Sequence, residues 1–203
     1  VLSDGRKLCG ILIELQSNTS AVIGIGLNLH LPVAMPDEVR ATAAALAAGH
    51  AVVIADLKPP SEPLPDGASY LPLDITDAAA LKSWISDTAA ELGSVDMLFS
   101  NAGAMAQGGD PASWEQNFRL DVLGAVNAFE AARPWLEASG EKTGDAAFVI
   151  ISSISAAQAD TASSYGPIKA ALIHMAKGLA RQYAARKIRV NVVSPGTVYF
   201  KGG

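Results

Sequence analysis

The stretch from Ala147 to Lys169 constrains the fold of this chain most, because it joins an apolar run to a helix through a serine-rich turn. Ala147 to Ile151 has the length and composition of a short buried strand. Ser152 and Ser153 follow it directly. Because ligands of an open α/β sheet bind outside the carboxyl ends of its strands, we expect a site at this position.

Tyr165 and Lys169 are four residues apart in the second half of this stretch. In a helix that begins near Ser164, the phenol and the ammonium lie on one face. The ammonium and the positive end of the helix both favour a phenolate, which suits a general acid or base. A serine hydroxyl at the strand end would hold a substrate carbonyl while Tyr165 transfers the proton.

Tyr-x-x-x-Lys after a strand-end serine resembles the short-chain dehydrogenase/reductase family. Asn101-Ala102-Gly103 after the apolar run Met97 to Ser100, and the segment Ile188 to Gly196, match the family too. The resemblance covers about residues 39–203 and implies a Rossmann-like, doubly wound, mostly parallel α/β sheet. It also implies an NAD(P)-dependent oxidoreductase that interconverts a carbonyl and an alcohol by hydride transfer.

The resemblance implies a role for each catalytic residue. Tyr165 would donate or accept the proton, Lys169 would favour the phenolate and hold the nicotinamide ribose, and a serine would orient the carbonyl oxygen. Strand register selects Ser153, whereas the family's spacing from Tyr165 selects Ser152. We favour Ser153, because loops absorb deletions more easily than strands shift register.

A fourth catalytic position departs from the family. The family has an asparagine that anchors a water molecule of a proton relay, and this chain has Asp121 there, within a predicted helix from Trp114 to Glu137. The negative charge would change such a relay. A helical aspartate without a catalytic role is the alternative.

The cofactor contacts are also implied by the resemblance. Asp56, after the predicted strand Ala51 to Ala55, would bind the adenosine ribose and favour NAD over NADP; a solvated loop aspartate is the alternative. Asp74 and Ile75, after the strand Tyr70 to Leu73, match the adenine-contacting pair. The predicted cofactor set is Asp56, Asp74, Ile75, Asn101, Ala102, Gly103, Tyr165, Lys169, Pro195, Gly196 and Val198.

One family motif is missing from the sequence. Residues 33–39 occupy the place of the glycine-rich turn, whose amides approach the cofactor phosphates, and they contain no glycine. Asp37 and Glu38, at the start of a predicted helix that ends at Ala48, add negative charge there. Gly24-x-Gly26 lies too far upstream to replace the turn. The alternative hypothesis is therefore a recombined or truncated chain that acts as a non-catalytic scaffold without a functional cofactor site.

The amino-terminal residues have a different pattern. Lys7 to Leu15 and Ala21 to Leu29 are predicted as two strands of a β-hairpin, because the residues between them are turn-forming. The segment resembles the central hairpin of biotin protein ligases, in which a lysine matching Lys7 contacts biotin. The ligase's adenylate loop is missing. We therefore predict a chimera, with a ligase-like hairpin at residues 1–32 and a dehydrogenase-like domain at residues 33–203.

Composition narrows the classes of partner. The chain is 50% hydrophobic and 17% charged, which argues against disorder, and its net charge of -5 without a basic run argues against nucleic acid. Cys9 is the only cysteine, and His30, His50 and His174 fall in unrelated contexts, so no metal site is expected. No apolar run approaches the roughly 20 residues that span a bilayer, so a cytoplasmic protein without a membrane partner is expected.

The resemblance implies a small-molecule carbonyl or alcohol substrate and a homodimer or homotetramer. In the family, the helix with Asp121 and the helix with Tyr165 build the dimer interface. In the family, substrate specificity is set mostly by residues that follow the position matching Gly203. The sequence therefore predicts the reaction class and not the substrate.

Overall fold

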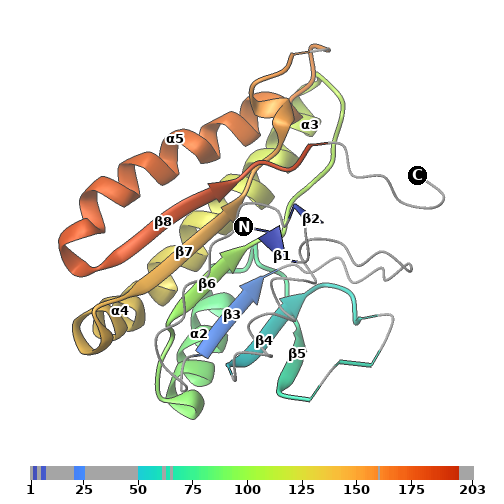
Figure 1. Ribbon diagram of the computed structural model, residues 1–203. Helices are drawn as coiled ribbons and strands as arrows, with labels where there is room; N and C mark the ends of the chain where they lie inside the picture. Colours follow the sequence, from blue (N-terminus) through green and yellow to red (C-terminus); the bar gives the residue numbers. More distant parts are fainter. Residues whose placement is uncertain are drawn as a thin grey trace.

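Parallel strands form the central sheet of the protein, and helices follow them along the chain (Figure 1). The computed structural model describes residues 2–3, 6–7, 21–25, 50–60, 63–64, 66–159 and 161–196. The strands of the sheet are β3 Ala21–Ile25, β4 Ala51–Asp56, β5 Ala68–Pro72, β6 Met97–Ser100, β7 Ala146–Ile151 and β8 Ile188–Val193. The helices are α2 Ala78–Leu92, α3 Pro111–Asn117, α4 Gly124–Thr143 and α5 Tyr165–Tyr183, with the short helical turns η1 Phe118–Leu123, η2 Ile154–Ala156 and η3 Ala184–Arg186.

The order of the strands makes the sheet doubly wound. From one edge to the other it is β5, β4, β3, β6, β7, β8, and every neighbouring pair is parallel. The chain runs outward from β3 in one direction through β4 and β5, and then in the other direction from β6 to β8. The direction therefore reverses between β3 and β6, where open α/β sheets bind their ligands. The predicted Rossmann-like architecture is confirmed.

The first strand of the sheet corrects a prediction. The sequence predicts an antiparallel hairpin for Ala21–Ile25, but β3 pairs in parallel with β4 on one side and with β6 on the other. Both of its edges are thus occupied, so the predicted antiparallel pairing of this strand is wrong. A short apolar run does not distinguish a hairpin strand from a central parallel strand.

The remaining amino-terminal expectations are tested only in part. The described strands β1 (Leu2–Ser3) and β2 (Arg6–Lys7) form a short antiparallel pair of their own. Most of the predicted strand Lys7 to Leu15, the predicted helix Asp37 to Ala48 and the expected place of the glycine-rich turn lie outside the described residues. The division at residues 32 and 33 stays a prediction.

Side chains on both faces of the sheet belong to buried clusters, as is typical of parallel sheets. Leu98 and Phe148 point into the larger core cluster, which α2, α4 and α5 cover, and the ring of Phe129 stacks on Phe148 with 5.2 Å between centroids. Met97 and Ala147, their neighbours in sequence, belong to a second cluster. Adjacent strand residues thus point to opposite faces.

The helix predicted from Trp114 to Glu137 extends further at both ends. It consists of α3, the π-helical turn η1 and α4, which follow one another without a break. Asp110 caps the start, with Pro111 in the first helical position, which proline suits. Gly144 ends α4 in the left-handed conformation, with φ of 82°. These capping residues explain the additional turns.

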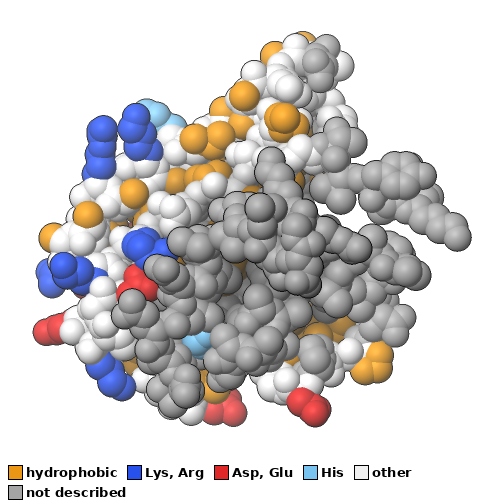
Figure 2. Space-filling view, viewed as in Figure 1, with side chains coloured by type: hydrophobic (Ala, Val, Ile, Leu, Met, Phe, Trp, Pro, Cys, Tyr) orange, Lys and Arg blue, Asp and Glu red, His pale blue; other side chains and the backbone are white. Residues whose placement is uncertain are grey.

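The helix after the serine-rich turn matches the prediction. α5 begins at Tyr165, and an apolar stripe faces the core while basic side chains face solvent. Figure 2 shows basic side chains gathered over α5 and the start of β8. The apolar stripe comprises Ile168, Leu172, Met175 and Leu179. The basic side chains that face solvent are Lys177, Arg181 and Arg186.

Within the described residues, no helix is long and apolar enough to cross a membrane.

Candidate active site

The predicted site residues come together at the carboxyl edge of the sheet. Asp56 ends β4, Asn101 follows β6, Ser152 follows β7, and Pro195 follows β8. Because the strands are parallel, these four positions lie at the same edge (Figure 1). α5 begins at this edge as well, since it starts shortly after β7.

Tyr165 and Lys169 share one face of α5, as their spacing predicts. The ammonium of Lys169 lies 5.5 Å from the centroid of the Tyr165 ring. Tyr165 is half-buried, whereas Lys169 is only 5% exposed. A cation beside an aromatic ring in a desolvated position interacts strongly with that ring and with its phenolate.

The buried ammonium of Lys169 is paired with Asp121. The Nζ atom lies 2.5 Å from Oδ1 of Asp121 and donates a 3.3 Å hydrogen bond to the carbonyl of Ile151. The other carboxylate oxygen, Oδ2, accepts a 2.8 Å hydrogen bond from the amide of Ala104. Asp121 therefore joins η1 to α5 and to the loop after β6. An ammonium has three donors, so one donor of Lys169 has no acceptor among the described residues.

Gly103 lies directly against this ion pair. A Cβ atom at Gly103 would lie 2.9 Å from Oδ1 of Asp121 and 3.1 Å from Nζ of Lys169. Such approaches are closer than van der Waals contact, so a side chain there would displace the pair. Asn101 and Ala102 are half-buried, and Ala102 packs against the core.

The two serines after β7 differ in what their hydroxyls do. Ser152 is 3% exposed, and its Oγ donates a 2.8 Å hydrogen bond to the carbonyl of Lys169. Ser153 is half-buried, and its Oγ accepts a 3.2 Å hydrogen bond from the amide of Ser155, which caps η2. A hydroxyl that accepts retains its own proton for donation. Ser153 can thus donate to a carbonyl oxygen, and Ser152 is already engaged.

The start of η2 brings Ser153 close to the first turn of α5. The carbonyl oxygen of Ser155 lies 2.7 Å from the position of a Cβ on Gly166, so the two backbones touch there. The amide of Ile154 donates to the carbonyl of Pro195, which ties η2 to the turn after β8. Gly196 is exposed, and Val198 lies outside the described residues.

The predicted adenosine contacts lie at the ends of β4 and β5. Asp56 is half-buried; its Oδ1 accepts from the amide of Lys58, and its carbonyl accepts from the hydroxyl of Tyr70. Burial, together with the charge of Asp56, raises the pKa of Tyr70. Asp74 is exposed, and hydrogen bonds from the amide and the hydroxyl of Thr76 lower the pKa of its carboxyl.

The side chain of Ile75 lies in the core. Its side chain is 4% exposed and belongs to the main core cluster. A Cβ on Gly124 of α4 would lie 2.7 Å from its Cδ1 atom. The side chain of Ile75 therefore packs against α4, and only its backbone is left to contact a ligand.

Two buried polar residues beside the site were not predicted from the sequence. Asn117 ends α3 and Ser164 precedes Tyr165, and both have 0% exposure. Asn117 lies one helical turn before Asp121, which is the signal that would have drawn attention to it.

Within the described residues no group of three His, Cys, Asp or Glu side chains is arranged to hold a metal ion.

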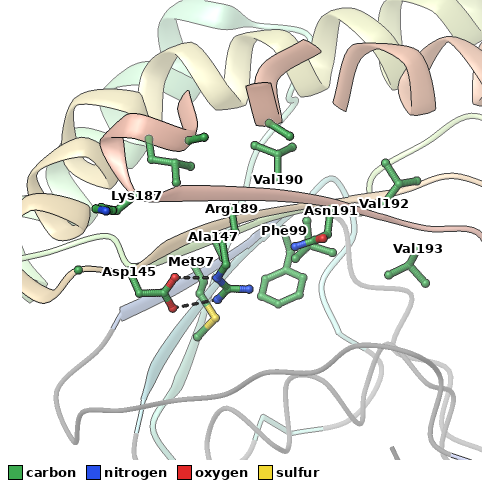
Figure 3. Close-up of a pocket in the computed structure, with 15 residues that line it drawn as sticks. Met97, Phe99, Asp145, Ala147, Lys187, Arg189, Val190, Asn191, Val192 and Val193 are labelled. Carbon is green, nitrogen blue, oxygen red and sulfur yellow. Dashed lines mark hydrogen bonds and ion pairs between the residues drawn. The ribbon is translucent and has the colours of Figure 1, made fainter. Parts of the chain in front are cut away.

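A concave region lies away from these residues. An open groove of about 700 Å³ runs along the edge strand β8 and the neighbouring sheet surface (Figure 3). Arg189 and Asp145 form a two-bonded ion pair in it, at 2.7 and 2.9 Å, and Figure 3 shows Met97 and Phe99 in its wall. None of the predicted site residues lines this groove.

Comparison with known proteins supports the same fold. The family model described as enoyl-(acyl carrier protein) reductase matches residues 39–201. Isoepoxydon dehydrogenase of Penicillium expansum is 34% identical over 132 residues, which cover 64% of this chain and 49% of that protein. This chain thus spans about half the length of the curated relatives that it matches.

Solved structures align over more of the chain. A short-chain dehydrogenase from Streptomyces avermitilis is 27% identical with a TM-score of 0.73, covering 89% of this chain and 67% of that one. A short-chain dehydrogenase from Leptospira borgpetersenii with bound NAD+ is 19% identical with a TM-score of 0.76, covering 94% and 78%. Together with the family model, which extends over most of the sequence, these matches show that the chain belongs to the short-chain dehydrogenase/reductase family.

Proposed function

We propose that this protein is an NAD(P)-dependent oxidoreductase that interconverts a carbonyl and an alcohol on a small-molecule substrate. The observation that carries the proposal is the group formed by Tyr165, Lys169 and Ser153 at the carboxyl edge of the sheet. The ammonium lies beside the phenol, and the hydroxyl of Ser153 retains a proton to donate. The names of relatives such as isoepoxydon dehydrogenase agree with this reaction class.

In the direction of reduction, Tyr165 gives its phenolic proton to the carbonyl oxygen. A bound nicotinamide cofactor supplies the hydride that adds to the carbonyl carbon. The product is the alcohol, and Tyr165 is left as a phenolate, which the ammonium of Lys169 stabilises. Ser153 donates a hydrogen bond to the same oxygen while negative charge develops on it. In the direction of oxidation, each proton transfer is reversed.

The residues at the sheet edge fit a nicotinamide dinucleotide. The point between β3 and β6, where the order of strand addition reverses, lies beside Gly103, whose missing side chain leaves room next to Lys169. The third donor of Lys169 would bind the nicotinamide ribose, and Asp56 would bind the adenosine ribose. The carboxylate of Asp56 favours NAD over NADP, because it repels the additional phosphate.

Further contacts complete the proposed cofactor site. Asp74 and the backbone of Ile75 would lie at the adenine, and Asn101, Ala102 and Gly103 at the adenosine ribose. Pro195, Gly196 and Val198 would lie at the nicotinamide carboxamide. The segment expected at the phosphates lies among residues 26–49, all of it outside the described residues.

Asp121 is proposed as the fourth member of the catalytic group, in a role of its own. Its carboxylate forms an ion pair with Lys169 and accepts a hydrogen bond from the amide of Ala104, so it fixes the ammonium relative to the loop after β6. This differs from an asparagine that anchors a water molecule. Asp121 acts through Lys169 and is therefore a positioning residue.

The proposal is tested first by cofactor binding. The purified chain is titrated with NADH and with NADPH, and nicotinamide fluorescence and calorimetric heat are recorded. We expect saturable binding at micromolar concentration, tighter for NADH. Absence of binding at millimolar cofactor would favour the scaffold hypothesis instead.

Turnover is then tested with a panel of aldehydes and ketones. Tyr165→Phe removes the proton donor without a change in ring size, so it should bind the cofactor like the wild type. Its turnover should fall by roughly 10²- to 10⁴-fold, the range of general acid catalysis. Equal turnover would remove Tyr165 from the mechanism.

Several expectations stay predictions. They are a homodimer or homotetramer, a cytoplasmic location, the division into residues 1–32 and 33–203, and the ligase-like origin of the first segment. Thermal unfolding with added biotin tests the last of these, because a ligand that binds the native state raises the melting temperature.

A further inference from the structure

Asn117 and Ser164 form a buried hydrogen-bonded link between α3 and the start of α5. The Nδ2 atom of Asn117 donates to Oγ of Ser164 at 2.8 Å and to the carbonyl of Ala106 at 2.9 Å. Its Oδ1 atom accepts from the amide of Ala106 at 3.2 Å. Both donors and the acceptor of this fully buried amide are therefore satisfied, as buried polar groups require.

Ser164 uses its hydroxyl for a loop and not for its own helix. It is the N-cap residue of α5, where a serine ordinarily accepts from an amide of the first turn. Its side chain makes no such bond. Its hydroxyl donates to the carbonyl of Gly108 at 2.9 Å, and its amide donates to the same carbonyl at 3.0 Å. The N-cap residue Ser164 therefore binds the loop that contains Gly108 and does not cap its own helix.

The loop from Asn101 to Gly109 is held at three points. Asp121 binds the amide of Ala104, Asn117 binds the backbone of Ala106, and Ser164 binds the carbonyl of Gly108. A Cβ at Gly109 would lie 2.7 Å from the carbonyl of Ala162, so the loop also touches the segment before α5.

Two polar links thus join the continuous segment of α3 and η1 to α5, one on each side of Tyr165. Asp121 pairs with Lys169, four residues after the tyrosine, and Asn117 binds Ser164, directly before it. Asn117 and Asp121 are themselves one turn apart, and the π-helical turn η1 begins between them. Turns of this kind occur frequently at functional sites, since they change the direction of side chains along a helix.

We propose that Asn117 and Ser164 are positioning residues for Tyr165, which hold the first turn of α5 against the loop 104–109 so that the phenol meets the substrate oxygen. This inference rests on the proposed function, because it assigns Tyr165 the proton transfer. Asn117 and Ser164 act through the backbone and touch no reacting atom. A displacement of about 1 Å at a reacting group can lower the rate by about 10²-fold.

The test compares Ser164→Ala with Ser163→Ala. Ser163 is the neighbouring serine and lies outside the network, so its variant is the matched control. Ser164→Ala should lower kcat by about 10- to 10²-fold, with the dissociation constant of NADH unchanged. Asn117→Ala should have a similar effect, and the double variant should be no worse than the poorer single one, because residues that act as a unit are not additive.

Amide hydrogen exchange gives a readout that does not depend on activity. Peptides that cover residues 104–110 and 163–168 should exchange faster in Ser164→Ala than in the wild type and in Ser163→Ala. Ser164→Cys, which keeps the shape and has only a weak donor, should lie between the two. If Ser164→Ala does not fold, the exchange rates and kcat of Ser164→Cys are compared with those of the wild type instead.

The outcomes separate this inference from the proposed function. Faster exchange with an unchanged kcat would overturn the positioning role, and equal exchange in Ser164→Ala and wild type would overturn the link itself. A wild-type chain that binds NADH but shows no turnover would contradict the proposed function. In that case faster exchange in Ser164→Ala would still support the link, and equal exchange would still overturn it.

Discussion

The ammonium of Lys169 lies 2.5 Å from Oδ1 of Asp121, and the two side chains are 6% and 1% exposed. The family pattern has an uncharged asparagine at this position. An aspartate offsets part of the ammonium charge that acts on the phenolate of Tyr165, and at the same time it fixes the ammonium beside the ring. The pair therefore couples the stability of the fold to the chemistry of the site.

Asp121→Ala should destabilise the protein strongly. The variant leaves a buried ammonium without its carboxylate, and breaking a buried ion pair costs about 3–5 kcal/mol of the free energy of unfolding. Urea unfolding at neutral pH measures this difference. Asp145→Ala is the matched control, because its pair with Arg189 is about half exposed, at 47% and 46%, and such pairs contribute about 0–1 kcal/mol. Equal losses in the two variants would contradict a buried, mutually dependent pair.

Gly103→Ala should be destabilising although it adds only a methyl group. The new Cβ would lie 2.9 Å from the carboxylate of Asp121 and 3.1 Å from the ammonium of Lys169. Overpacking of this kind costs about 1–3 kcal/mol. Gly178→Ala in α5 is the control, because a Cβ added there would have no atom within 4 Å and alanine is favoured over glycine in a helix by about 1 kcal/mol. Opposite signs for the two changes in unfolding free energy are expected.

The two serines after β7 should respond differently to alanine. Ser153→Ala removes the donor proposed for the carbonyl oxygen, and loss of one such donor lowers kcat by about 10²- to 10³-fold. Ser152→Ala removes the hydrogen bond to the carbonyl of Lys169, which costs about 1 kcal/mol of stability and leaves most of the turnover. Steady-state kinetics and urea unfolding of both variants check this. If Ser152→Ala lost the larger share of turnover, the two roles would have to be exchanged.

The sheet and its helices were largely predictable because their signals are local. The strand Met97–Ser100 is bounded by polar and glycine residues, and Asp77 caps α2 as its position before an alanine-rich run indicates. The place of Ala21–Ile25 was not predictable in this way, because the partners of a strand are set by residues far away in sequence. Its apolar composition suits a hairpin and a central parallel strand equally well.

The candidate site shows the same division between local and distant information. The helical spacing of Tyr165 and Lys169 predicts that their side chains lie on one face, and this geometry depends on one helix alone. Asn117 has only its position one turn before Asp121 as a signal, and Ser164 has none, because a buried asparagine or serine is recognised only when the loop that it binds is in place. The pairing of Asp121 with Lys169 also depends on how η1 packs against α5.

The start of α3 should make stability depend on pH in the acid range. Asp110 caps this helix, and hydrogen bonds from the hydroxyl and the amide of Ser113 hold the pKa of its carboxyl below its usual value. A lowered pKa in the folded state means that the unfolded state binds the proton more readily. The stabilisation is therefore present above the unfolded pKa of about 3.9 and is lost as the pH falls through the lower folded value.

Ser113→Ala removes the larger of these two causes and so tests the assignment. Its folded pKa at Asp110 moves back towards the unfolded value, so its stability should fall less than that of the wild type between neutral pH and pH values below about 4. Urea midpoints measured across this range check the difference, with Ser163→Ala as a control that leaves the cap intact. If wild type and Ser113→Ala lost stability in parallel as the pH fell, another carboxyl would be responsible for the acid sensitivity, and the helix that carries Asn117 would have to be anchored by its packing.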